Sequence, residues 1–248
     1  MQEAIRKECI NTLHFQNTHT IDKGEPMHTC SLCLSPIEIF TTWNTRVYFR
    51  CPTCCLIQLD AQSHPSRSEE KSEYLMHNND SADEGYRRFL SRVTNPVLEW
   101  LEQNHTATAQ LLDFGCGPGP TISVVLGEGG WKMENYDPMF YPTASLLEEQ
   151  YDLIVCTEAA EHFYTPKTTW SQMIALMKDT GRLIVMTHVS DKHGVPSDFK
   201  GWHYIREQSH VSLYHTDTMR WIANEYGLRL TILDRNVCCF DRSQAVLQ

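Results

Sequence analysis

The sequence predicts an α/β protein in which a sheet with helices on both faces follows a small module organised by cysteines. Two observations lead to this fold class. From residue 110 onward, short apolar strands alternate with helices, which is the pattern of a parallel sheet covered on both faces. Before residue 61, two Cys-x-x-Cys pairs flank a strand-like run. We therefore divide the chain into four regions: a lead-in (1–25), a cysteine module (26–60), a linker with helices (61–105) and an α/β core (106–248).

Length and composition narrow the class of protein. The 248 residues suit one medium domain with a small appendage, and 41% hydrophobic residues are enough for a core. No apolar run reaches the length of a membrane span, and residues 1–10 lack the apolar centre of a signal peptide. We therefore expect a cytoplasmic protein without a membrane partner. A net charge of −10 makes a nucleic-acid substrate unfavourable, because proteins that bind a phosphate backbone usually present a basic face.

The two cysteine pairs indicate a metal site. Cys30-x-x-Cys33 and Cys51-x-x-Cys54 are 17 residues apart, and the run TRVYFR (residues 45–50) between them reads as a strand. Two such turns can offer four thiolates to one zinc ion, and four thiolates leave no open coordination position. The sequence therefore predicts a structural zinc ribbon over residues 26–60. Four unligated cysteines are the alternative, and Cys55 complicates the choice of ligands.

A linker and a helical region follow the cysteine module. Residues 61–68 are polar and contain one proline, which is typical of a linker. Residues 69–103 have helical periodicity, and Pro96 is expected to break or kink that helix. Apolar residues recur at a spacing of four and would form one stripe on it: Phe89, Val93, Val97 and Leu101.

The core region reads as strands and helices in alternation. Strands are expected at 110–114, 131–136, 151–157, 181–187, 228–233 and 237–240. Helices are expected at 120–128, 168–178 and 216–226.

A glycine-rich turn joins the first core strand to its helix. In LLDFGCGPG (residues 111–119), the glycines let the backbone approach a ligand, and the helix start that follows offers free N–H groups. Asp113 ends this strand, and Asp137 follows the next strand, where a carboxylate can hold two ribose hydroxyls. A tight turn without a ligand is the plain alternative. A dehydrogenase is less favoured, because the turn lacks GxGxxG spacing.

The segments LLDFGCGPG, NYDP and YDLIVCTEAAEHF resemble the successive cofactor motifs of class I S-adenosylmethionine-dependent methyltransferases. The resemblance covers about residues 86–240 and extends to a bacterial methyltransferase-23-like subgroup that carries an N-terminal zinc ribbon. It implies a Rossmann-like sheet and S-adenosylmethionine as the cofactor. One departure is visible, since only residues 139–150 separate the second strand from YDLIV, so the family's third strand must be very short or absent.

The resemblance also assigns roles to residues of the cofactor site. The loop around the methionine part comprises Gly115, Cys116, Gly117, Pro118 and Gly119. Asp113 would lie near the amino group, and Asp137 would hold the ribose with Tyr136 and Pro138 beside it. Two further groups are expected to line the pocket. The first group, from the region before the core, comprises Tyr86 and Asn79. The second, which follows the YDLIV strand, comprises Glu158 and His162.

Histidines are the candidates for chemistry. Residues 188–215 hold five of the twelve histidines, and the stretch GWHYIREQSHVSLYH resembles a recurrent element of the bacterial subgroup. We expect 188–215 to form a substrate cap, with His203 and His210 facing the cleft and His162 near the donor. A histidine could act as general base, or imidazoles could hold a second metal. Scattered surface histidines are the third possibility.

The predicted reaction is methyl transfer to a small-molecule acceptor. Two alternatives remain. One is an RNA methyltransferase that uses the zinc ribbon to bind its substrate. The other is a non-catalytic protein that binds S-adenosylmethionine and zinc. The cofactor motifs do not choose the acceptor, because they fix only the position of the donor.

Overall fold

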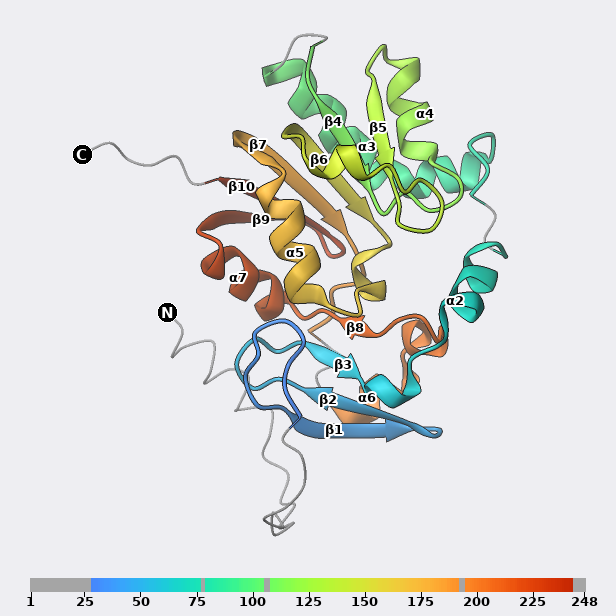
Figure 1. Cartoon of the computed structure of the whole chain (residues 1–248), viewed down its shortest axis with the longest axis vertical. Coiled ribbons are helices and arrows are strands. Elements are labelled where there is room, and N and C mark those ends of the chain that lie inside the picture. Colours follow the sequence, from blue (N-terminus) through green and yellow to red (C-terminus); the bar gives the residue numbers. More distant parts are fainter. Residues whose placement is uncertain (1–27, 77–78, 105–107, 192–194, 243–248) are drawn as a thin grey trace, which may run out of the picture.

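The computed structural model describes residues 28–76, 79–104, 108–191 and 195–242, so the predicted lead-in (1–25) lies outside the described residues. Two sheets organise these residues (Figure 1). The larger has six strands in the order β5-β4-β6-β7-β10-β9, and the smaller has four in the order β1-β2-β3-β8. None of the described helices is both long and apolar enough to cross a membrane.

The large sheet contains the six strands expected in the core. Their bounds are β4 Leu111–Phe114, β5 Met133–Tyr136, β6 Tyr151–Thr157, β7 Met177–Met186, β9 Leu228–Asp234 and β10 Val237–Arg242. Strands β5, β4, β6 and β7 are parallel, but β10 runs antiparallel to both β7 and β9. The parallel pattern read from the sequence therefore does not extend to these two closing strands. Only Arg235 and Asn236 join β9 to β10, and so short a link permits a hairpin but no parallel crossover.

Helices cover both faces of this sheet, as predicted (Figure 1). On one face lie α3 Glu84–Asn104 and α4 Thr121–Glu128, and on the other lie α5 Pro166–Ala175 and α7 Thr216–Glu225. Successive strand residues point to opposite faces, so each buried strand serves both layers. Leu111 and Leu153 pack in the α3–α4 layer, whereas their neighbours Leu112 and Ile154 pack in the α5–α7 layer.

Helix α3 differs from its prediction in two respects. It continues through Pro96, so the expected break does not occur. Val93 and Val97, on either side of the proline, are fully buried, and this packing holds the helix where one hydrogen bond is lost. Phe89 is 36% exposed, so the buried stripe begins one residue later, at Leu90.

The region between β5 and β6 contains no strand. Residues 137–150 are all described, and their regular structure is the 3-10 helix η2 Ala144–Leu147. Strand β5 is therefore an edge of the sheet. This confirms that the third strand of the family pattern is absent.

The small sheet joins the cysteine module to the predicted cap. Its strands are β1 Glu38–Trp43, β2 Arg46–Arg50, β3 Ile57–Leu59 and β8 Ser212–Leu213. The last of these belongs to residues 188–215 and pairs with β3. The same segment supplies α6 Pro196–Gly201 and the 3-10 helix η5 His203–Arg206. Module and cap share a core in which Tyr48 packs against Phe199, so they form one layer below the large sheet (Figure 1).

The predicted linker 61–68 is partly structured. It contains the 3-10 helix η1 Ala61–Ser63, and its Ser66 caps helix α2 Arg67–Tyr74. The Ser66 side chain accepts from the backbone of Glu69, and the Glu69 carboxylate accepts from the backbone of Ser66. This capping box is legible as S-x-x-E in the sequence, so the linker expectation overlooked a helix start.

Candidate functional site

The two Cys-x-x-Cys turns have the same local geometry. The backbone N–H of Leu34 donates to the carbonyl of Cys30 at 3.0 Å, and that of Cys55 donates to Cys51 at 2.9 Å. Leu34 and Cys55 have φ of 63° and 61°, a region that favours glycine. Cys55 therefore occupies the turn position after the second pair and lies outside the thiol cluster.

Four thiols converge between these turns. Sγ of Cys30 lies 3.5 Å from Sγ of Cys54, Sγ of Cys33 lies 3.3 Å from Sγ of Cys51, and all four atoms lie within 4.8 Å of one another. A tetrahedral zinc ion with bonds of about 2.3 Å holds its sulfur ligands about 3.8 Å apart. The donor set and its spacing thus fit one zinc ion with four protein ligands and no open position.

The glycine turn lies at the carboxyl end of β4. Gly115 and Gly117 have φ of 78° and 64°, which other residues adopt at a cost. A Cβ at Gly115 would lie 2.8 Å from Cβ of Ala159, and one at Gly119 would lie 2.7 Å from the backbone oxygen of Asn79. Asn79 precedes α3, so the segment before the core packs directly on the turn.

Asp137 connects the end of β5 to this turn. Its Oδ2 accepts from the backbone N–H of Gly117 at 3.1 Å, and its Oδ1 accepts from Met139 at 2.7 Å and Phe140 at 3.0 Å. The carboxylate is therefore held at the lip of the turn by three backbone donors. Each carboxylate oxygen has two acceptor positions, so it can still accept a ligand hydroxyl.

A cavity of about 480 Å³ opens beside the glycine turn. The loop contributes Gly115, Cys116, Gly117 and Pro118 to its wall, and α3 contributes Tyr86. Its acidic lining comprises Asp137, Glu158, Glu161 and Glu207. Its basic and aromatic lining includes His162, His203, Arg206, His210, Tyr74 and Tyr204. Gly119 and Asp113 do not line this cavity.

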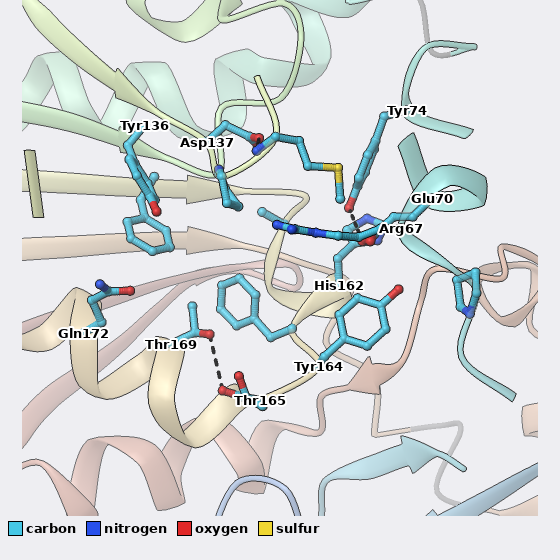
Figure 2. Close-up of a pocket in the computed structure, with 17 residues that line it drawn as sticks. Arg67, Glu70, Tyr74, Tyr136, Asp137, His162, Tyr164, Thr165, Thr169 and Gln172 are labelled. Carbon is cyan, nitrogen blue, oxygen red and sulfur yellow. Dashed lines mark hydrogen bonds between the residues drawn. The ribbon is translucent and has the colours of Figure 1, made fainter. Parts of the chain in front are cut away.

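A second cavity, of about 440 Å³, adjoins the first and shares Tyr74, Asp137 and His162 with it. Figure 2 shows Arg67, Glu70 and Tyr74 reaching in from α2, opposite Tyr136 and Asp137 at the end of β5. The Tyr74 hydroxyl donates to Glu70 Oε1 at 3.2 Å. Helix α2 thus forms one wall of the second cavity.

Carboxylates around the turn are poorly solvated. Burial, and then the nearby charge of Asp137, raise the pKa of Asp113 to about 7. Burial and the neighbouring Glu161 raise the pKa of Glu158, which has φ of 47° at the end of β6. Burial, with Asp113 and Glu158 nearby, raises the pKa of Tyr86 to about 12. The wall beside the turn therefore suits a ligand that brings positive charge.

The three candidate histidines occupy two places. The rings of His162 and His210 lie 4.8 Å apart at the inner end of the first cavity. His203 is exposed, lies 5.8 Å from His188 and lines the first cavity as well as a neighbouring one. His203 and His210 thus both face the cleft, as expected for the cap, but His203 stands at the rim.

Comparison with known proteins identifies the family. A family model described as "Methyltransferase domain" matches residues 82–232, well over half of the chain. The chain belongs to this methyltransferase family. The match confirms the resemblance to class I S-adenosylmethionine-dependent methyltransferases, and it makes the protein an enzyme. A search of curated proteins found no match.

Two solved structures illustrate the likeness of this methyltransferase to others. One is 1,6-didemethyltoxoflavin-N1-methyltransferase from Burkholderia thailandensis, solved with 1,6-didemethyltoxoflavin and S-adenosylhomocysteine. It is 13% identical with a TM-score of 0.50, over 84% of this chain and 100% of that one. The other is magnesium protoporphyrin IX methyltransferase from Synechocystis, 14% identical with a TM-score of 0.46, over 72% of this chain and 95% of that one. At 13% identity the first likeness shows the shared fold alone.

The methyltransferase site also contains residues whose burial or position the sequence did not predict. Glu161 is 1% exposed and lies beside His162 and His210. Its sequence context, EAAEH, resembled a cofactor motif and gave no sign that its second glutamate would be buried. Arg67, Glu70 and Tyr74 come from α2, which the Ser66 capping signal could have located.

Proposed function

We propose that this methyltransferase transfers the methyl group of S-adenosylmethionine to a small-molecule acceptor by in-line displacement at the sulfonium carbon. One observation carries the proposal. The glycine turn and Asp137 meet at the adjoining carboxyl ends of β4 and β5, beside a cavity of about 480 Å³. This is the edge at which open α/β sheets bind their ligands.

The donor is placed along that edge. Its methionine part follows the loop of Gly115, Cys116, Gly117, Pro118 and Gly119, with its ammonium group toward Asp113 and Tyr86 and its sulfonium toward Glu158. Asp137 accepts a ribose hydroxyl, with Tyr136 and Pro138 beside it. The adenine then enters the second cavity, where Met139 and Phe163 line the space left by the missing third strand.

The charge of the acceptor side favours a small molecule over RNA. Four carboxylates line the first cavity, and Arg206 is the one permanent cation among the described residues that line it. A site that grips a phosphate backbone needs several such cations. The remaining cavity beside the donor is walled by Tyr204, His203 and His210 from the cap, so the cap selects the acceptor.

The zinc ion is proposed as a structural cofactor of the module. Its four thiolate ligands would be Cys30, Cys33, Cys51 and Cys54, whose spacing supports tetrahedral coordination. Strand β3 follows the second cysteine pair directly and pairs with β8 of the cap. Zinc binding would therefore stabilise the acceptor wall as well as the module that contains it.

Calorimetric titration with S-adenosylhomocysteine tests the donor site. Asp137→Ala removes both the ribose acceptor and the anchor of Gly117, so we expect binding to weaken at least tenfold. Asp179→Asn is the matched control, because this carboxylate is exposed on β7, and its affinity should equal that of the wild type. Equal affinities for all three proteins would contradict the assignment.

A labelling experiment tests the acceptor class. The enzyme is incubated with methyl-labelled S-adenosylmethionine and a cell extract separated into metabolites and RNA. We expect label in the metabolite fraction. Label in RNA would favour the RNA alternative, and binding without transfer to either fraction would favour the non-catalytic one.

A further inference from the structure

Three side chains with metal-ligating atoms meet at the inner end of the first cavity. Glu161 and His162 belong to the 3-10 helix η3 Ala160–His162, and His210 lies just before β8. One ligand atom from each lies within 4.8 Å of the other two. Glu161 is 1% exposed and His210 is 4% exposed, so this cluster is unlike the acidic groups of an exposed surface.

Both imidazoles are fixed in the orientation that metal ligands require. Nδ1 of His162 lies 3.1 Å from the carbonyl oxygen of Ser209, and Nδ1 of His210 lies 2.7 Å from that of Tyr204. A carbonyl oxygen only accepts, so each Nδ1 carries a proton and Nε2 is the ring atom that can bind a metal ion. Nε2 of His210 also lies 3.3 Å from Oε2 of Glu207, so an ion bound there would have a second carboxylate beside it. An Nδ1–H bonded to a backbone carbonyl is the usual outer support of a metal-bound histidine.

The carboxylate of Glu161 supplies a second, independent observation. Its Oε2 accepts from the Thr187 hydroxyl at 2.7 Å, which holds the side chain in place. Its Oε1 is buried without a partner in hydrogen-bond geometry among the described residues, although the Tyr204 hydroxyl interacts with the same carboxylate, and it lies 4.0 Å from Nε2 of His210. A buried carboxylate oxygen without a partner is costly, and a cation between it and the imidazole would remove that cost.

We propose that Glu161, His162 and His210 bind one divalent transition-metal ion, which holds an oxygen atom of the acceptor beside the donor's methyl group. Two ligands about 2.1 Å from one ion are at most about 4.2 Å apart, and the 4.0 Å separation of Oε1 and Nε2 falls within that limit. Two imidazoles and one carboxylate suit Zn²⁺, Mn²⁺, Fe²⁺ or Co²⁺, whereas Mg²⁺ and Ca²⁺ prefer oxygen ligands.

The consequence for the substrate rests on the proposed methyl transfer. Three protein ligands leave coordination positions for an acceptor, which then presents a hydroxyl or enol oxygen. Coordination lowers the pKa of that hydroxyl, and its proton leaves to solvent through the open side of the cavity. The oxygen lone pair forms the O–CH₃ bond while the S–CH₃ bond breaks and leaves its electron pair on sulfur. The products are a methyl ether or enol ether, S-adenosylhomocysteine and one proton.

Electron paramagnetic resonance with Mn²⁺ tests the site directly. The full chain is first loaded with one equivalent of zinc, which the four-thiolate site takes because thiolates prefer zinc to the harder Mn²⁺, and unbound metal is removed. Titration should then show one bound Mn²⁺ per wild-type chain. Glu161→Gln and His162→Ala should each weaken this binding at least tenfold. His203→Ala is the matched control, since this histidine lines the same cavity outside the cluster and its loss should leave Mn²⁺ binding unchanged.

Circular dichroism verifies the fold of each variant, and His162→Ala carries the test if the buried Glu161→Gln does not fold. Absence of Mn²⁺ binding to the wild type, or equal binding by the wild type and the folded cluster variants, would overturn the proposal. S-adenosylhomocysteine binding to the wild type is measured on the same sample. Donor binding without Mn²⁺ binding refutes the metal site alone, and Mn²⁺ binding without donor binding refutes the proposed function alone.

Discussion

Asp113 should make donor binding depend on pH near neutrality. Burial and the charge of Asp137 raise the pKa of this carboxyl to about 7 in the free protein. In the proposed complex the donor's ammonium group lies near it, in direct contact or through water, and favours the charged carboxylate. Binding therefore requires that the proton leave Asp113, and affinity should rise as pH increases through 7.

The expected magnitude follows from that pKa. If only the carboxylate form binds, the apparent dissociation constant is raised about 11-fold at pH 6 and about 1.1-fold at pH 8. The change of about tenfold corresponds to about 1.4 kcal/mol. S-adenosylhomocysteine keeps the ammonium group, so calorimetric titration between pH 6 and pH 8 measures the effect. Binding should also release a proton, which appears as a dependence of the measured heat on the buffer.

The variant Asp113→Asn tests whether Asp113, rather than a neighbouring carboxyl, causes the pH dependence of donor binding. The variant should bind more weakly at pH 8, and its affinity should lose the tenfold change, because the amide does not titrate. Asp137 and Glu158 remain in both proteins, so any dependence due to them persists in the variant. Asp179→Asn should behave like the wild type. A wild-type affinity that does not change with pH, or the same pH dependence in Asp113→Asn, would show that the protonation of Asp113 does not control donor binding.

Three further perturbations have outcomes set by local packing. Gly119→Ala places a methyl group 2.7 Å from the backbone oxygen of Asn79 and should weaken S-adenosylhomocysteine binding. Gly127→Ala is the control, because its methyl group meets nothing within 4 Å and should leave binding unchanged. Equal affinities of the two variants would argue against a tight turn. Cys33→Ser should remove the stoichiometric zinc measured by mass spectrometry and lower the melting temperature, and unchanged zinc content would exclude the four-thiolate site. Phe199→Ala empties a fully buried site in the shared core of module and cap, and it should cost about 3–5 kcal/mol in denaturant unfolding. A loss below 1 kcal/mol would show that this core is loosely packed.

Much of the core could be predicted from local pattern. The run YDLIVCT has an apolar centre, LIVC, and β6 spans all seven of its residues. The glycine turn could be predicted because the backbone has positive φ at Gly115 and Gly117, and glycine is the residue that adopts positive φ at least cost. The absent third strand was also predictable, since a twelve-residue interval is too short for a strand with its helix.

Other features depend on contacts between distant segments. Strand β8 has two residues, and its pairing with β3 joins positions more than 150 residues apart. Local periodicity cannot predict so short a strand, because the hydrogen bonds that define it come from the distant cysteine module. The burial of Glu161 has the same origin, since the 209–212 segment covers it. Val211 donates to the Glu161 carbonyl at 2.9 Å, and the Ser212 hydroxyl donates to that of Phe163 at 2.8 Å.

These contacts explain why loss of zinc from the cysteine module should affect donor binding and acceptor binding differently. The glycine turn and Asp137 belong to the large sheet and depend on its own strands. The acceptor wall belongs to a cap whose β8 is hydrogen-bonded to the cysteine module and whose core includes Tyr48 of β2. Loss of zinc in Cys33→Ser should therefore impair methyl transfer while S-adenosylhomocysteine binding persists. Proteolysis should then attack residues 195–215 together with the cysteine module, because the two share one core. Loss of donor binding in parallel with transfer would instead mean that the cysteine module supports the whole sheet.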